Sequence, residues 1–430
     1  MAAVMQFTQS TEPIDVSALR LGMFIHLEGG WLSHPFPRSS FKITSEDQLL
    51  TLRSLGIGTL RWSPDLSDPE ALPTSFSAAP AVAAETVNPA ELDAIDARIA
   101  RRAALSAQRQ ALAECERQFS EATRASKRVF DSVVSHPIQA CQGAQALTRE
   151  LVDKMLGSEA LCIRLLSEAA GDKASAHAVN VSVISLLMGR IFGLAEAEML
   201  DLGLGALLHD IGKADIPERF RHRDDHHTTA EQKLYETHVV HGIAQARRMD
   251  LGAGAATVIA QHHELIDGSG FPLKLTSDRT SVPSRIVALV NRYDNLCNPA
   301  SNPGKAVTPH EAVALMFAQG KNKYDPAILG AFIKMMGVYP AGSVVQLTDD
   351  RYALVVGVNS SRPLKPRVLV HEPGVPRDEA MILDLETVGS LGIRRSLKPT
   401  ALPEQALSYL SPRPRISYFF ESVRDLEPIR

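Results

Sequence analysis

Residues 204–217, LGALLHDIGKADIP, place three ionisable side chains at the end of an apolar stretch. The run at 206–208 predicts the end of a buried helix, and His209 and Asp210 follow it directly, with Lys213 one turn further along. Buried polar groups are costly unless something satisfies them. This segment therefore predicts a helical core that ends in a polar site.

The surrounding region, residues 145–338, has helical periodicity throughout, including the segment SEALCIRLLSEA at 158–169. Five or more helices indicate a compact all-α domain. Beyond Tyr339, short apolar and alternating runs separated by turn residues predict an antiparallel β module. The end of this module, SYLSPRPRISYFFES, is ambiguous.

The domain prediction is a multidomain, mainly α chain with five parts. We expect a small α+β domain at 1–62, a linker at 63–88, a long helix at 89–135, the helical core at 140–338 and the β-rich module at 339–430. The linker is rich in Ala, Pro and Ser and lacks periodicity. The long helix has few apolar positions, which fits a solvated connector or a dimerisation helix, and we favour the connector.

Composition excludes several classes of protein. A net charge of −4 gives no basic excess for a nucleic-acid polymer. The four cysteines form no CxxC pair, which argues against a zinc ribbon or a disulfide framework. The N-terminus lacks a signal peptide, and no stretch approaches the roughly 20 apolar residues of a membrane span. We expect a cytoplasmic protein.

Five histidines of the helical region come from four separate segments, and the residues are His177, His209, His238, His262 and His263. Neutral imidazoles and a carboxylate are ligands that divalent iron, manganese and zinc accept. Asp210 can give one oxygen to each of two ions, and a carboxylate-bridged ion pair indicates hydrolysis of a phosphate ester. Lys213, one turn from His209, can reach a phosphate oxygen or the leaving group.

Other histidines have simpler interpretations. His222, His226 and His227 lie in a polar stretch before a capping box, where we expect a solvated loop. For His241, one turn from His238, we favour packing or support of a ligand over coordination. Glu264 has two open interpretations, orientation of a ligand or simple surface placement.

At these residues the sequence resembles the HD-GYP family of metal-dependent phosphohydrolases, which degrade cyclic di-GMP in bacteria. The match covers about residues 145–335, and the N-terminal segment at 14–36 is similar to a small domain of unknown function that often precedes this catalytic domain. The motifs that carry the resemblance are His177, His209-Asp210-x-Gly-Lys213, His238, His262-His263-Glu264 and Asp267-Gly-Ser-Gly-Phe-Pro272.

The resemblance implies roles for individual residues. The implied metal ligands are His177, His209, Asp210, His238, His262, His263 and Asn291, and the implied cofactor is a pair of divalent ions, iron or manganese. Lys213 and Asp210 carry the implied catalysis. The implied substrate-binding residues are Lys213, Gly270, Phe271, Pro272, Arg285 and Lys305.

Three departures from the family pattern matter. Asn291 stands where the family has its last metal-ligating aspartate, so the site loses a negative charge. The segment 297–312 lacks the family's phosphate-binding arginine and keeps only Lys305. Lys173 stands where a third ion would need an acidic residue or histidine, so we expect two ions at most.

The leading hypothesis is therefore a cyclic di-GMP phosphodiesterase. The alternative is a degenerate module that binds cyclic di-GMP or a signalling protein without turnover, and a third is an HD-type phosphohydrolase acting on another nucleotide. A homodimer is compatible with the sequence.

Overall fold

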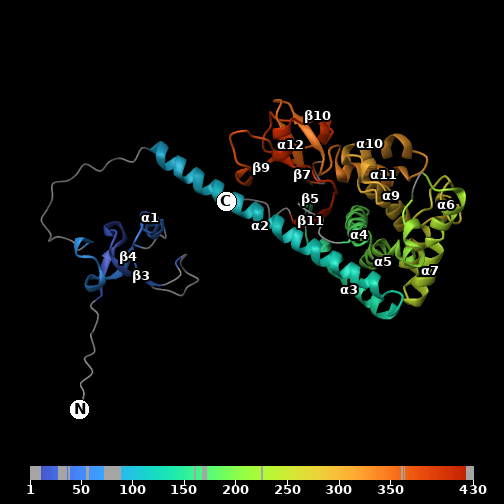
Figure 1. Cartoon of the computed structure of the whole chain (residues 1–430), viewed down its shortest axis with the longest axis horizontal. Helices are drawn as coiled ribbons and strands as arrows, with labels where there is room; N and C mark the ends of the chain where they lie inside the picture. Colours follow the sequence, from blue (N-terminus) through green and yellow to red (C-terminus); the bar gives the residue numbers. More distant parts are fainter. Residues whose placement is uncertain are drawn as a thin grey trace, which may run out of the picture. The chain divides into compact units, whose positions relative to one another are not determined.

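The computed structural model describes residues 11–27, 36, 39–54, 58–71, 89–158, 161–166, 172–223, 226–359, 362 and 364–422. The chain divides into two compact units, Met1–Pro89 and Ala90–Arg430 (Figure 1). Most of the predicted linker, at 72–88, lies outside the described residues. The prediction of a mainly α multidomain chain is confirmed.

The first unit is a small α+β domain. Its strands form an antiparallel sheet in the order β1-β4-β2-β3, and the strand bounds are β1 Glu12–Asp15, β2 Phe24–His26, β3 Ser40–Lys42 and β4 Thr59–Ser63. Helix α1, Glu46–Ser54, contributes Leu52 to a core that also contains Met23, Ile25, Ile43 and Trp62. This apolar core joins the sheet to the helix.

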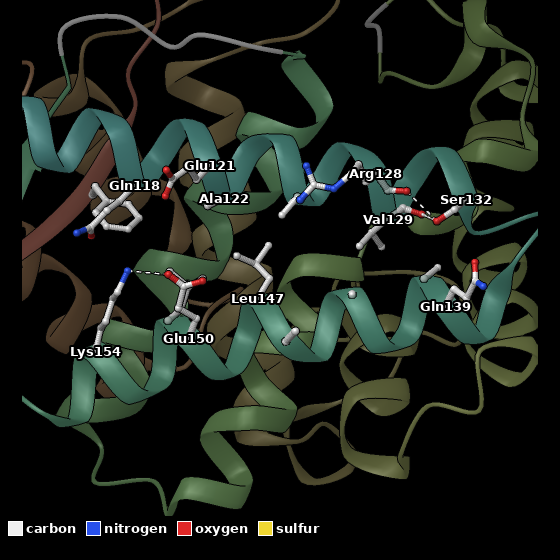
Figure 2. A pocket seen from close by; sticks show the side chains of 16 residues that line it. Gln118, Glu121, Ala122, Arg128, Val129, Ser132, Gln139, Leu147, Glu150 and Lys154 are labelled. Carbon is white, nitrogen blue, oxygen red and sulfur yellow. Dashed lines mark hydrogen bonds and ion pairs between the residues drawn. The ribbon is translucent and has the colours of Figure 1, made fainter.

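The long predicted helix is α2, Pro89–Ser132, and α3, Pro137–Leu156, follows it after a short turn. The two helices lie side by side, and the groove between them has a volume of about 470 Å³ (Figure 2). Cys115, Phe119 and Val129 of α2 are buried, as is Val133 directly after it. The second half of this helix is therefore part of the core rather than a solvated connector.

The remaining helices form the core of the second unit, and their bounds are α4 Lys173–Ile191, α5 Glu196–Leu208, α6 Thr229–Glu236, α7 His238–Arg248, α8 Ala253–Gln261, α9 Val282–Cys297, α10 Pro309–Gly320 and α11 Pro326–Met336. Helix α4 is buried along most of its length. By length and composition alone it could cross a membrane, which corrects the expectation that no stretch approaches such a span. Its burial among the other helices identifies it as a core helix.

The segment predicted as a helix at 158–169 contains a strand instead. This strand, β5 (Leu161–Leu165), is buried at all five positions, and a short run of this length fits a buried strand as well as a helix turn. It joins the C-terminal strands β6 Val344–Leu347, β7 Tyr352–Asn359, β8 Arg367–Val370, β9 Ile382–Asp384, β10 Ile393–Leu397 and β11 Tyr418–Ser422.

The predicted boundary between a helical core and a β module at 338/339 does not separate two compact units. The sheet runs in the order β10-β6-β7-β5-β11, so β5 lies between two strands that come much later in the chain, with Cys162 paired to Asn359 and Leu165 to Tyr418. Helix α12, Glu404–Leu410, precedes β11. One continuous apolar core contains residues of both the helices and the sheet.

Candidate metal centre

Side chains from four segments of the second unit meet at one buried point. One imidazole comes from α4, two groups come from the end of α5, one imidazole begins α7, and two follow the end of α8; the residues are His177, His209, Asp210, His238, His262 and His263. Each side chain offers one nitrogen or oxygen ligand atom to a group, and within each of two groups these ligand atoms all lie within 4.8 Å of one another. We name these groups the His177 cluster (His177, His209 and Asp210) and the His238 cluster (Asp210, His238, His262 and His263).

The close approach of α7 to the end of α5 depends on Gly212. A Cβ atom at this position would lie 2.0 Å from the carbonyl oxygen of His238 and 2.2 Å from the amide nitrogen of Gly242. No side chain fits into that space. The glycine in the motif at 209–213 therefore lets the backbone that carries His238 pack against the turn after Asp210.

Three imidazoles are oriented by backbone carbonyls of the turn that precedes each of them. The Nδ1 atoms of His209, His238 and His262 lie 2.8, 2.6 and 2.7 Å from the carbonyl oxygens three residues earlier. Since a carbonyl can only accept, each Nδ1 carries the proton and each Nε2 presents a lone pair to the centre. This tautomer is the one that binds a metal through Nε2.

The fourth imidazole, His177, is oriented from a distance. Its Nδ1 donates to Oδ2 of Asp294, 117 positions away in the sequence, at 2.5 Å. Asp294 is buried and lies on α9. Asp294 orients an imidazole, whereas Asn291 is the position that the family match implies as a metal ligand, and no local pattern in the sequence indicates the role of Asp294.

The facing nitrogens need a cation between them. Nε2 of His177 lies 3.3 Å from Nε2 of His209, and Nε2 of His238 lies 3.2 Å from Nε2 of His262. Lone pairs at this distance repel unless a positive charge separates them. Oδ1 of Asp210 is also buried and has no hydrogen-bond partner among the described residues. These donors fit divalent ions.

Electrostatics keep the ligand set in its binding form. Burial lowers the pKa of His238 to about 4 and lowers the pKa values of His262 and His263 well below the usual range. Burial alone would raise the pKa of Asp210, but Lys213 and His209 hold it well below its ordinary value. At neutral pH, the imidazoles of His238, His262 and His263 are therefore neutral. The carboxylate of Asp210 is charged.

The turn Gly270-Phe271-Pro272 covers one side of the centre. The ring of Phe271 stacks on the ring of His263, with centroids 4.4 Å apart. Gly270 packs so closely on the backbone of 263–265 that a Cβ would approach within 2.4 Å. The turn therefore contacts the imidazole directly through the aromatic ring.

Glu264 follows neither of its two predicted roles. Its side chain is buried, and its carboxylate accepts hydrogen bonds from the backbone amides of Leu273 and Leu275 at 2.7 and 2.8 Å. It fixes the chain that follows the turn. Glu264 thus supports the 270–272 turn rather than a ligand or the protein surface.

A cavity of about 530 Å³ opens beside the His238 cluster, which contributes His262 and His263 to its wall. The charged residues that line it are all basic, and none of the described lining residues is acidic; the basic side chains are Lys213, Arg223, Arg292, Lys305 and Lys323. Aromatic side chains of Tyr235, Phe271 and Tyr324 also line it. This cavity fits a ligand with phosphate groups and aromatic rings.

Two residues are placed differently from their predictions, the predicted substrate-binding Arg285 and the predicted loop residue His222. Arg285 does not line this cavity; its guanidinium pairs with Asp325 at 2.6 Å and donates to the carbonyl oxygen of Thr280, so its role is structural. His222 was expected in a solvated loop, but it is partly buried and lines the cavity. Gly270, Phe271 and Lys305 line the cavity, whereas Pro272 is not among its lining residues, and binding of substrate by these residues stays a prediction.

Sequence reasoning missed Arg223 and Arg292. Both side chains are exposed in the cavity wall, and neither has an ion-pair partner in the described part of the chain. They lie near Tyr324. Burial raises the pKa of this tyrosine to about 12, and the two guanidinium groups oppose part of that rise. Basic residues nearly 70 positions apart give no joint signal in a sequence.

Asn291 is buried and lines the same cavity. Its Oδ1, the atom that would coordinate an ion, accepts a hydrogen bond from Asn295 at 2.6 Å. Coordination by Asn291 therefore stays a prediction, and the histidines and Asp210 supply the donors described above.

Comparison with known proteins gives three results. Residues 12–144 match a family described as a domain of unknown function (DUF3391), and residues 160–328 match the HD domain family. The chain is 30% identical over 373 residues to cyclic di-GMP phosphodiesterase PA4108 of Pseudomonas aeruginosa, which covers 83% of this chain and 84% of that protein.

Two further similarities are more limited. A 3'3'-cGAMP-specific phosphodiesterase 2 of Vibrio cholerae is 31% identical over 131 residues, 30% of this chain and 25% of that protein. Among solved structures, Bd1817, an HDG"Y"P protein from Bdellovibrio bacteriovorus, matches with a TM-score of 0.43 and 15% identity, over 75% of this chain and 98% of that chain.

Proposed function

Because the chain belongs to the HD-GYP family of HD-domain cyclic di-GMP phosphodiesterases, we propose that it hydrolyses a phosphodiester bond of cyclic di-GMP in bacterial signalling. The observation that carries this proposal is the position of the two clusters. They share Asp210, and a cavity whose charged lining is entirely basic lies beside them.

The ligands proposed for a pair of divalent ions are His177, His209, Asp210, His238, His262 and His263. The absence of thiolate and the presence of imidazole and carboxylate in these clusters favour iron or manganese. Such an ion pair supplies an activated water nucleophile at neutral pH and positive charge for the phosphoryl oxygens. The protein fixes the donors in place before substrate arrives.

Lys213 links the clusters to the substrate cavity. Its ammonium lies 2.6 Å from Oδ2 of Asp210, and the Asp210 carboxylate raises the lysine pKa although burial opposes this. The side chain therefore stays charged and lines the cavity. We assign to it the stabilisation of charge on the phosphate under attack.

The rest of the cavity binds the remainder of the substrate in this proposal. Arg223, Arg292 and Lys323 provide the positive charge that the segment after Asn298 lacks, and they would bind the second phosphate of a cyclic dinucleotide. Phe271 and Tyr324 offer faces for a purine ring. Because one relative is named as a 3'3'-cGAMP-specific phosphodiesterase, this mixed cyclic dinucleotide is the appropriate second substrate to test.

The test uses the full chain, stripped of metal and reloaded anaerobically with Mn²⁺ or Fe²⁺. Cyclic di-GMP, 3'3'-cGAMP and linear pGpG are incubated separately, and products are followed by chromatography with a chelator-treated control. We expect linear product from cyclic di-GMP only in the metal-loaded protein. Binding of cyclic di-GMP without product at full ion occupancy would instead establish a sensor module.

A further inference from the structure

A buried polar network connects His177 to the C-terminal strand of the sheet. The Nδ1 atom of His177 donates to Oδ2 of Asp294, and the other carboxylate oxygen accepts from Nδ2 of Asn180 and of Asn298, each at 3.0 Å. Asp294 and Asn180 are almost completely inaccessible to solvent. The carboxylate is therefore held from three sides, by residues of α4 and of the end of α9.

The two asparagines also hold the chain that enters β11. The side-chain amides of Asn180 and Asn298 donate to the carbonyl oxygen of Ile416 at 3.0 and 2.8 Å. In the other direction, the backbone amides of Ile416 and Tyr418 donate to the side-chain oxygens of Asn298 and Asn180 at 2.8 and 3.1 Å. Each asparagine thus uses both amide protons and its oxygen.

Strand β11 is itself fixed by contacts outside this network. The hydroxyl of Tyr418 lies 2.8 Å from that of Tyr293 and donates to the carbonyl oxygen of Ala341 at 3.1 Å. At the other end of the strand, Glu421 forms a buried ion pair with Arg164 of β5 at 2.9 Å. The segment 416–418 therefore offers the asparagines a rigid partner.

We propose that Asn180, Asn298 and the backbone of 416–418 are positioning residues that hold Asp294, and through it His177, in the geometry that binds an ion. This inference rests on the proposed assignment of the His177 cluster as a metal site. It makes the C-terminal segment a part of the metal centre rather than an appended module. Partners that orient ligating histidines typically contribute 10- to 100-fold to metal affinity.

The experiment measures Mn²⁺ binding by the full-length, metal-stripped chain, without substrate. Ion stoichiometry is read by elemental analysis after desalting and by titration, and electron paramagnetic resonance distinguishes a coupled ion pair from an isolated ion. For Asn180→Ala combined with Asn298→Ala, and for Asp294→Asn, we expect one ion to bind at least about 10-fold more weakly, with loss of the coupled signal.

The matched control is Tyr418→Phe, which loses two buried hydroxyl contacts but keeps the backbone bond to Asn180. We expect a lower melting temperature with two ions still bound. The inference is overturned if the asparagine variants bind both ions as the wild type does, or if Tyr418→Phe loses an ion equally.

The outcomes separate this inference from the proposed function. A wild-type chain that binds two ions but yields no product from cyclic di-GMP contradicts the proposed function, and the network can still be judged from ion binding. A wild-type chain that binds only one ion, and binds it equally well in His177→Gln, has no metal site at the His177 cluster and overturns the inference, whatever its activity.

Discussion

The His238 cluster and the His177 cluster share Asp210, yet their imidazoles are held in different ways. His238 and His262 each donate to a carbonyl three residues earlier, within or next to their own helix. His177 instead donates to the side chain of Asp294. That carboxylate accepts hydrogen bonds from Asn180 and Asn298, and these two asparagines in turn hold the chain that enters β11. The His238 cluster contains two imidazoles held by local bonds, whereas the His177 cluster combines one local bond, at His209, with one at His177 that depends on the packing of the whole unit.

This difference indicates which imidazoles are most sensitive to substitutions elsewhere in the chain. A local bond to a backbone carbonyl survives most side-chain substitutions, because no side chain supplies the acceptor. A side-chain acceptor such as Asp294 is lost with one mutation, and a change at its supporting residues can weaken it. The His177 cluster is therefore the one through which distant parts of the chain can influence ion binding.

The largest effect is expected from a substitution of Asp210, because its carboxylate belongs to both clusters. Asp210→Asn takes away the negative charge from both clusters, so we expect loss of both ions and a fall in kcat/KM on the order of 10³-fold. Ion content and turnover of cyclic di-GMP measure this. Asp131→Asn, an exposed carboxylate on α2, is the matched control and keeps both. Two bound ions in the Asp210 variant would show that Asp210 is not a ligand that both clusters require.

The next test breaks one cluster and spares the other. His238→Gln removes an Nε2 donor from the His238 cluster only, and His177→Gln does the same for the His177 cluster. We expect each variant to retain one ion, with activity lower by roughly 10²-fold. Elemental analysis and titration with Mn²⁺ check the stoichiometry. If either variant loses both ions at once, the clusters do not bind independently.

Acid should destabilise the metal-free protein through the His238 cluster. Burial holds the pKa of His238 at about 4, against about 6.5 in the unfolded chain. Below pH 6.5 the unfolded state takes up a proton that the folded state does not, so this contribution is complete above pH 6.5 and falls as the pH approaches 4. At pH 5 the loss is about 2 kcal/mol.

Urea unfolding of chelator-treated protein at pH 7 and pH 5 measures this loss. His262 and His263 have pKa values lowered in the same direction and add to it. In His238→Gln the difference in unfolding free energy between the two pH values should be smaller by about 2 kcal/mol. An unchanged difference would show that His238 is not the group responsible.

The smallest effect is expected outside both clusters, in the wall of the cavity. Arg292→Ala and Arg223→Ala each remove a charged hydrogen-bond donor to a phosphate, so we expect KM to rise about 10-fold per substitution. Ion content and kcat should change little. Arg247→Ala, an exposed arginine of α7 outside the cavity lining, provides the comparison. A fall in kcat with unchanged KM would argue against substrate binding by these arginines.

Much of the candidate site could be predicted from the sequence because its signals are local. His209, Asp210 and Lys213 follow one apolar helix end, and the Gly270-Phe271-Pro272 turn stands shortly after the histidine pair. The strand β5 was missed because five consecutive apolar or buried positions have no period that distinguishes strand from helix. Its partners, β7 and β11, come only later in the chain.

The sequence by itself determined the ligand types and the position of His209, Asp210 and Lys213 at the end of an apolar helix. Those features depend on backbone geometry over a single turn. Only the tertiary structure decided that Asp294 orients His177, that Arg285 is structural while Arg223 and Arg292 line the cavity, and that β11 belongs with the helices. These depend on contacts between distant segments, which the packing of the common core creates.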